Sequence, residues 1–150
     1  MSDLSELYQD LILDHNRRPR NFGELPDATC HADGHNPLCG DRVVVAARIE
    51  DGIIRDIRFT GSGCAISKAS ASLMTEAVRE RRVAEALELF DRFQAMLTTP
   101  TGQPVDAEAF GKLAVFAGVR EFPMRVKCAT LAWHTLKAAL LQPGGVVRTE

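Results

Sequence analysis

Three cysteines in unlike sequence contexts are the residues of this chain most able to do chemistry. Cys39 lies in the run NPLCGD, Cys64 lies in GSGCA, and Cys128 ends the run RVKC. Each stands near an expected boundary between elements, where its side chain can be directed at a shared point. With Asp41 they supply three sulfurs and one carboxylate, which is a closed tetrahedral set for Zn²⁺. The spacing is not a zinc-finger CxxC pattern, so spacing alone makes these four residues only a candidate set.

Hydrophobic periodicity predicts the elements that must position these residues. Apolar residues three and four apart predict an amphipathic helix over residues 4–13. Strand patterns cover residues 42–49 and 53–60, with residues 50–52 as the turn of a hairpin. The other expected elements are a short edge strand over 28–31, a loop over 33–37, and helices over 64–81, over 83–97, over 107–117 and from Pro123 onward.

The expected fold class is α+β, a small antiparallel sheet of about three strands packed against helices. In the second hairpin strand, Ile53, Ile57 and Phe59 are expected to share one face. A hairpin brings the start of one strand beside the end of its partner. Cys39 and Cys64 are therefore expected at the same end of the sheet.

Composition limits the classes of function. The chain has 150 residues and a formal net charge of −2, so it lacks the concentrated basic face that nucleic-acid binding requires. Its apolar runs are too short to span a membrane, and its N-terminus has no signal-peptide pattern, so a cytoplasmic location is expected. There, cysteines more often bind metals or react than form disulfides. Residues 1–142 are expected to form a single domain, and residues 143–150 a flexible C-terminal tail.

The sequence around the cysteines resembles one family. The runs PLCGD, GSGCAIS and RVKCATLAW are similar to those of the IscU/SufU (NifU N-terminal-like) family of iron–sulfur cluster assembly proteins. The likeness extends to about Leu141. IscU-type scaffolds carry histidine directly before the third cysteine, where this chain has Lys127, and they have a shorter spacer between the second and third cysteines. Both departures resemble the SufU branch.

This resemblance implies a fold, a metal and an activity. It implies a SufE/NifU-like fold in which the last helix brings Cys128 to the other ligands. It also implies that the protein is a zinc-dependent sulfurtransferase. Such a protein accepts persulfide sulfur at Cys39 from a SufS-type PLP-dependent cysteine desulfurase. It then delivers the sulfur to downstream proteins for iron–sulfur cluster assembly. Arg125 and Lys127 are expected to assist catalysis by charge, because they lie beside Cys128 and would offset the negative charge of a zinc–thiolate set.

Two other functions stay open. An IscU-type scaffold would assemble an Fe–S cluster on the same thiols, although a protonated Lys127 cannot act as a ligand. A zinc-stabilised regulator would instead only activate the desulfurase.

The remaining cysteine and the histidines have weaker claims to the site. Cys30 matches no motif cysteine and is expected in the core or on an edge strand. Trp133 is expected in the core, on the apolar stripe of the last helix. The donor set is complete without histidine, so the histidines are secondary candidates as ligands: His15, His31, His35 and His134.

Overall fold

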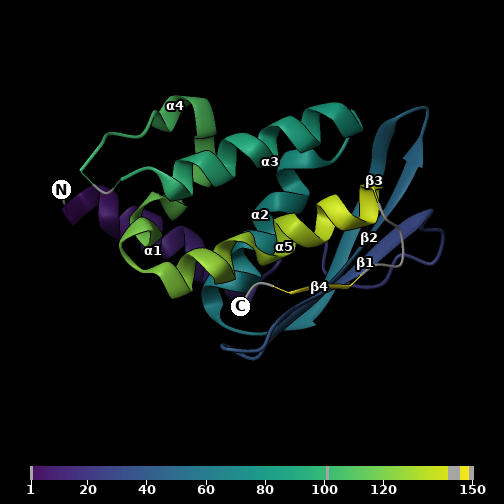
Figure 1. Ribbon diagram of the computed structural model, residues 1–150, viewed down its shortest axis with the longest axis horizontal. Helices are drawn as coiled ribbons and strands as arrows, with labels where there is room; N and C mark the ends of the chain where they lie inside the picture. The colour runs from purple at the N-terminus through teal and green to yellow at the C-terminus, as the bar shows by residue number, and fades with distance from the viewer. Residues whose placement is uncertain (1, 101, 142–145, 149–150) are drawn as a thin grey trace.

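The computed structural model describes residues 2–100, 102–141 and 146–148 of the chain. The described elements are helices and strands that alternate in blocks, as Figure 1 shows. In chain order they are α1 (Ser2–Arg17), β1 (Cys30–Asn36), β2 (Asp41–Glu50), β3 (Ile53–Ser62), α2 (Ala65–Val78), α3 (Val83–Thr98), α4 (Ala107–Phe110), the 3₁₀-helix η1 (Gly111–Glu121), α5 (Pro123–Leu141) and β4 (Val146–Arg148).

The strands form one four-stranded sheet in the order β3–β2–β1–β4. Successive hairpins pair β1 with β2 and β2 with β3 in antiparallel fashion, and the second of these hairpins is the one that the sequence predicted. The short strand β4 adds to the free edge of β1 in parallel orientation. The predicted α+β class is therefore confirmed, with one short parallel strand beside the expected three.

Strand β1 begins later and extends further than the sequence predicted. A strand was expected over residues 28–31 and a loop over 33–37, but residues 30–36 pair continuously with β2. Glycine, aspartate and asparagine in this stretch favour a loop locally. However, Ala32 and Asn36 are fully buried on the inner face of the strand, so pairing and burial outweigh local composition.

A β-bulge changes which side chains of β3 face the helices. The register between β2 and β3 shifts at Arg48 and Ile49, which leaves one extra residue in β3. Ile54 is buried as a result, and the prediction that Ile53 shares the inner face was wrong. The later inward residues are as predicted: Ile57 and Phe59.

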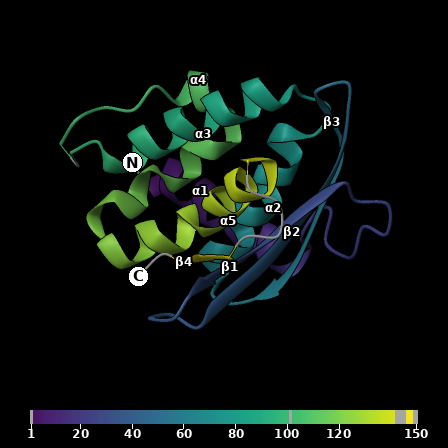
Figure 2. The same ribbon diagram turned by 45° about the vertical axis from the view of Figure 1, so that its right-hand side comes forward.

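The helices lie on one face of the sheet, and α5 is the central helix of this layer (Figures 1 and 2). It packs on β1 and β2 on one side and on α2, α3 and η1 on others. Trp133 of α5 is fully buried, as predicted, and stacks on Phe93 of α3 with ring centroids 4.7 Å apart. Gly34 lets β1 approach α5, because a Cβ there would lie 2.0 Å from Thr135 Oγ1.

Some helices differ in their limits from the predicted ones. Helix α2 ends at Val78, three residues before the expected limit. The helix expected over residues 107–117 is a single α-turn, α4, followed from Gly111 by η1. Pro123 opens α5, as expected for a residue whose missing N–H costs nothing in the first turn.

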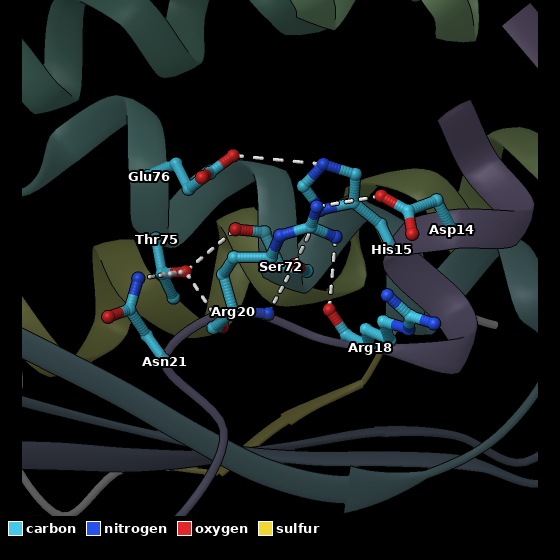
Figure 3. A network of polar contacts seen from close by, with 8 residues as sticks. All are labelled: Asp14, His15, Arg18, Arg20, Asn21, Ser72, Thr75 and Glu76. Atoms are coloured by element: carbon cyan, nitrogen blue, oxygen red, sulfur yellow. Dashed lines mark hydrogen bonds and ion pairs between the residues drawn. The ribbon is translucent and has the colours of Figure 1, made fainter.

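Buried polar contacts fasten the end of α1 to α2, as Figure 3 shows. His15 is fully buried, and its Nδ1 lies 2.7 Å from Ser72 Oγ. The backbone N–H of Arg20 donates to the same hydroxyl at 2.8 Å. Asn21 Nδ2 donates to Thr75 Oγ1 at 3.0 Å. These contacts fix α1 along the helix whose N-terminus carries Cys64.

The structure bears only in part on the predicted C-terminal tail and on the predicted absence of a membrane-spanning segment. The flexible tail over residues 143–150 stays a prediction, because 142–145 and 149–150 lie outside the described residues, while β4 between them is a paired strand. Within the described part, no helix combines the length and apolar character needed to cross a membrane.

Candidate metal centre

The tip of the β1–β2 hairpin carries the first cysteine. Asn36 and Asp41 are opposite each other in the register, so the turn between them holds four residues, 37–40. Within this turn Gly40 has φ +72°, a left-handed conformation that glycine adopts without strain. Cys39 is exposed, whereas both residues that close the turn are fully buried.

Asp41 connects this turn to Cys64. The backbone N–H of Cys64 donates to Asp41 Oδ1 at 2.8 Å, and Cys64 Sγ lies 3.7 Å from Oδ2. Cys64 is the N-cap of α2, and its sulfur accepts the N–H of Ser67 at 3.4 Å. A Cβ on Gly63 would lie 2.4 Å from Asp41 Oδ1, so only glycine leaves room for this carboxylate.

Cys128, in the second turn of α5, completes the cluster. Its side chain is 3% exposed, and its Sγ lies 3.4 Å from Cys39 Sγ. One donor atom each from Cys39, Asp41 and Cys128 lie within 4.8 Å of one another, close enough to hold a single metal ion. Cys64 joins this group through its contact with Asp41. The four predicted ligands are thus brought together from β1–β2, α2 and α5.

The electrostatics of the cluster favour a cation. Burial raises the pKa of the Cys128 thiol well above its ordinary value. Hydrogen bonds with Asp41 and Cys39 and the nearby charges of Cys64 and Asp41 raise this pKa further. Several groups that become anionic on deprotonation therefore lie close together, and their negative charges would repel one another. A divalent cation would offset this repulsion and displace the protons from the thiols. The donor set of sulfur and carboxylate oxygen fits Zn²⁺.

An open groove of about 570 Å³ gives access to the sulfurs. Exposed apolar side chains form part of its wall, including Leu13 of α1 and Met124 of α5. Arg125 also lines it, and its guanidinium carbon lies 4.5 Å from the centre of the Phe122 ring. Lys127 is half-buried near the start of α5 and directly precedes Cys128.

The secondary candidates lie away from the sulfurs. His31 and His35 occupy alternate positions of β1 from the buried ones, so they face away from α5. His134 packs edge-on against Phe90, with ring centroids 4.9 Å apart. His15 contacts α2 instead. Cys30 is buried in the core, as predicted, with its thiol directed at the Ala47 carbonyl at 3.7 Å.

The sequence reasoning missed Asn36. It assigned the residue to a loop, but the side chain is fully buried and its Nδ2 lies 3.9 Å from Cys128 Sγ. An asparagine before a proline is a known signal for a side chain that hydrogen-bonds its own turn, and that signal is present in the NPLC run.

Comparison with known proteins places this arrangement in a family. The family model described as NifU-like N terminal domain matches residues 7–129. An iron–sulfur cluster assembly scaffold protein IscU of Streptococcus pyogenes serotype M1 is 41% identical, and the match covers 93% of this chain and 86% of the relative. The zinc-dependent sulfurtransferase SufU of Bacillus subtilis (strain 168) is 37% identical, with 96% of each chain covered.

Solved structures support the same placement. A crystal structure described as a putative iron–sulfur cluster assembly scaffold protein for the SUF system, from Fervidobacterium islandicum AW-1, matches with a TM-score of 0.80. It is 34% identical in sequence, and the match covers 87% of this chain and 94% of that one. The fold and the sequence therefore point to the same relatives.

Proposed function

The chain belongs to the NifU-like N-terminal domain family, the IscU/SufU group of iron–sulfur cluster assembly proteins, and from this membership we propose that it acts as a zinc-dependent sulfurtransferase. One observation carries the proposal. Three cysteines from separate parts of the chain line one open groove, the buried Asp41 carboxylate lies beside their sulfurs, and only Cys39 among the three cysteines is exposed. A carrier needs such a combination of a fixed ligand set and one accessible sulfur.

Cys39, Asp41, Cys64 and Cys128 are the residues that would hold the zinc ion. When bound, zinc would keep the sulfurs in the thiolate form at neutral pH. The short contacts between these donors in the protein support this assignment, because their mutual repulsion as anions requires a compensating charge.

The transfer step takes place at Cys39, since its sulfur is open to an incoming group. Its thiolate attacks the terminal sulfur of a persulfide on the donor protein. A new S–S bond forms at Cys39 as the S–S bond of the donor breaks, and the electron pair leaves on the donor thiolate. The sulfur atom changes carrier without any external oxidant or reductant.

Arg125 and Lys127 serve this step by charge. Arg125 lies in the groove wall beside the cysteines, where a guanidinium can attract an anionic persulfide. Lys127 precedes Cys128 in the same helical turn. Lys127→Ala is expected to keep zinc while slowing transfer. If the variant loses zinc, Lys127 has a role in ligation or folding instead.

The proposed donor is a SufS-type PLP-dependent cysteine desulfurase, and the proposed recipients are downstream iron–sulfur assembly proteins. The test mixes purified protein, such a desulfurase and cysteine, and it follows sulfide release and persulfide on individual cysteines by mass spectrometry. Persulfide on Cys39, together with faster sulfide release, is expected. Activation of the desulfurase with no persulfide on this chain would identify a regulator.

A second function is supported by the names of several relatives. Proteins named IscU scaffolds are 41% and 38% identical to this chain, and thiolates with a carboxylate can also ligate an Fe–S cluster. Metal analysis and the visible spectrum separate the two functions. Colourless protein with zinc supports the sulfurtransferase, whereas a brown protein carrying iron and sulfide after reconstitution supports the scaffold.

A further inference from the structure

We propose that Asn36 is the positioning residue of the metal centre, and that its buried amide sets Cys39 and Cys128 relative to each other. Asn36 is the last residue of β1 and is 0% exposed, although its side chain is polar. A buried amide is retained only where its donors and acceptors are used. Its hydrogen bonds reach the turn that bears Cys39 and the sulfur of Cys128.

One end of Asn36 shapes the turn that bears Cys39. The backbone carbonyl of Asn36 accepts the N–H of Cys39 at 3.3 Å, which closes a β-turn. Its side-chain Oδ1 accepts the N–H of Leu38 at 3.2 Å, the pattern of an Asx turn. Two successive N–H groups of the exposed turn are thus held by one buried residue.

The other end of Asn36 reaches Cys128. The Nδ2 group donates toward Cys128 Sγ across 3.9 Å, and the two residues are 92 positions apart in sequence. On the opposite strand of the same hairpin, Asp41 contacts Cys64 in a similar way: its Oδ1 accepts the backbone N–H of Cys64 at 2.8 Å. The paired residues that close the turn, Asn36 and Asp41, therefore contact different cysteines of the cluster, Cys128 and Cys64.

This inference concerns the apo-protein as well as the metal-bound form, and only its metal readout rests on the proposed function. Groups that orient metal ligands without binding the metal commonly change affinity by about 10–100-fold when removed. Asn36→Ala is therefore expected to weaken zinc binding by at least about tenfold in competition with a chelator. The Co²⁺-substituted protein is expected to show altered sulfur-to-metal absorption bands. Leu38→Ala is the matched control, because it changes an exposed side chain of the same turn and keeps its backbone N–H.

A second measurement needs neither metal nor a sulfur donor. In metal-free Cys64→Ser protein, Cys39 and Cys128 are equilibrated with reduced and oxidised glutathione, and their disulfide is quantified. Its equilibrium constant reports the effective concentration of the two thiols. Loss of a positioning contact is expected to lower this constant about tenfold in Asn36→Ala and to leave it unchanged in Leu38→Ala.

Asn36→Asp keeps an acceptor for the N–H of Leu38 and replaces the donor that faces Cys128 with a charged carboxylate oxygen, so it serves if the alanine variant does not fold. It is expected to bind zinc more weakly and to lower the same disulfide constant. Wild-type zinc affinity, Co²⁺ spectrum and disulfide constant in either Asn36 variant would overturn the proposal. Failure of wild-type protein to accept sulfur would refute the proposed function but would leave the glutathione result standing.

Discussion

Residues of one type play different parts in this protein because their exposure differs. Cys39 is exposed at the end of a turn, Cys64 is half-buried at a helix N-terminus, and Cys128 is 3% exposed. Cys39 is therefore the most accessible of the three to a second protein. Cys30 has no contact with this group and directs its thiol at a backbone carbonyl.

Serine substitutions should separate these roles. Cys39→Ser, Cys64→Ser and Cys128→Ser are each expected to abolish stimulation of the desulfurase, because serine removes a thiolate from the metal set. Cys30→Ser should retain zinc and activity, and its free energy of unfolding should fall by only about 1 kcal/mol because serine can keep the contact with Ala47. Activity assays and denaturant melts provide the comparison. If Cys30→Ser were as inactive as Cys39→Ser, Cys30 would have a role in activity and would not be only a core residue.

Asp41 offers a cleaner separation of charge from geometry. Asp41→Asn retains an oxygen that can accept the N–H of Cys64, whereas Asp41→Ala removes both the charge and the acceptor. If the carboxylate is a ligand, both variants should lose zinc affinity by at least about tenfold while the domain stays folded. Chelator competition and circular dichroism supply the two readouts. If Asp41→Asn bound zinc as tightly as the wild-type protein, the role of Asp41 would be limited to its hydrogen bond with the N–H of Cys64.

The residue scale also marks the limit of what the sequence could predict. Motif context was sufficient to predict Cys39, Asp41, Cys64 and Cys128 as one group, and the structure brings them together. The burial of Asn36 and its contact with Cys128 were not predicted, because the partner lies 92 residues away and no local pattern encodes it. The burial of Ile54 in place of Ile53 was missed because simple alternation along a strand does not reveal a one-residue bulge.

At the scale of elements, each proposed ligand lies where one helix or strand begins or where two strands are joined. The hairpin between β1 and β2, the start of α2 and the start of α5 are the three junctions, and periodicity predicted their approximate positions. Periodicity could not predict that α5 crosses β1 at Gly34, because this approach depends on the missing side chain of one residue. The meeting of α5 with the hairpin was accordingly expected from family resemblance alone.

Gly63 tests one of these junctions without touching a ligand. A methyl group at this position would lie 2.4 Å from Asp41 Oδ1, so Gly63→Ala must displace the carboxylate or the start of α2. Weaker zinc binding is expected, with a smaller effect from Gly23→Ala, where a Cβ meets no atom within 4 Å. Isothermal titration with zinc compares the two variants. Equal affinities would show that the Asp41–Cys64 contact is not needed for the site.

The α1–α2 junction should make the protein sensitive to acid. Burial is the main cause that lowers the pKa of His15 below its usual 6.5, and the nearby Arg20 adds to it. The unfolded chain therefore binds a proton at a pH where the folded chain does not, and stability should fall as pH drops below about 6.5. The charged groups facing His15 are Asp14, Arg20, Glu76 and Lys112.

His15→Gln is expected to lower stability at pH 7.5, because the contact with Ser72 is weakened, and to flatten the decline between pH 6.5 and 5. Half-buried His134, whose pKa is also lowered by burial, should contribute a further part of that decline. Urea melts across this pH range measure both effects. An unchanged pH slope in His15→Gln would mean that His15 is protonated equally in both states.

For the molecule as a whole, the proposed metal centre takes residues from the sheet and from two helices, so bound zinc should act as a cross-link between these layers. Binding confined to the folded state adds about 2.7 kcal/mol when free zinc is 100 times the dissociation constant. For a chain of 150 residues this corresponds to a rise in Tm of about 5–10 °C. Chelation should reverse the rise, and a chelator-treated protein with unchanged Tm would contradict it.

The same centre should reverse the response of the protein to alkali. In metal-free protein the raised pKa of Cys128 favours the thiol in the folded state, relative to a usual value of 9.0. This contribution is fully present below pH 9.0 and is lost as pH rises above it, because the unfolded chain ionises first. With zinc bound, the thiolate is the favoured form, so rising pH should strengthen binding up to the point where the ligands are deprotonated. Thermal melts of both forms from pH 7 to 10 make the comparison, with Cys128→Ser as the control that should reduce the alkaline decline of the metal-free protein. Burial also raises the pKa of Cys30, so this thiol should account for a remaining part of the decline. A parallel decline in both forms would show that Cys128 does not bind the metal.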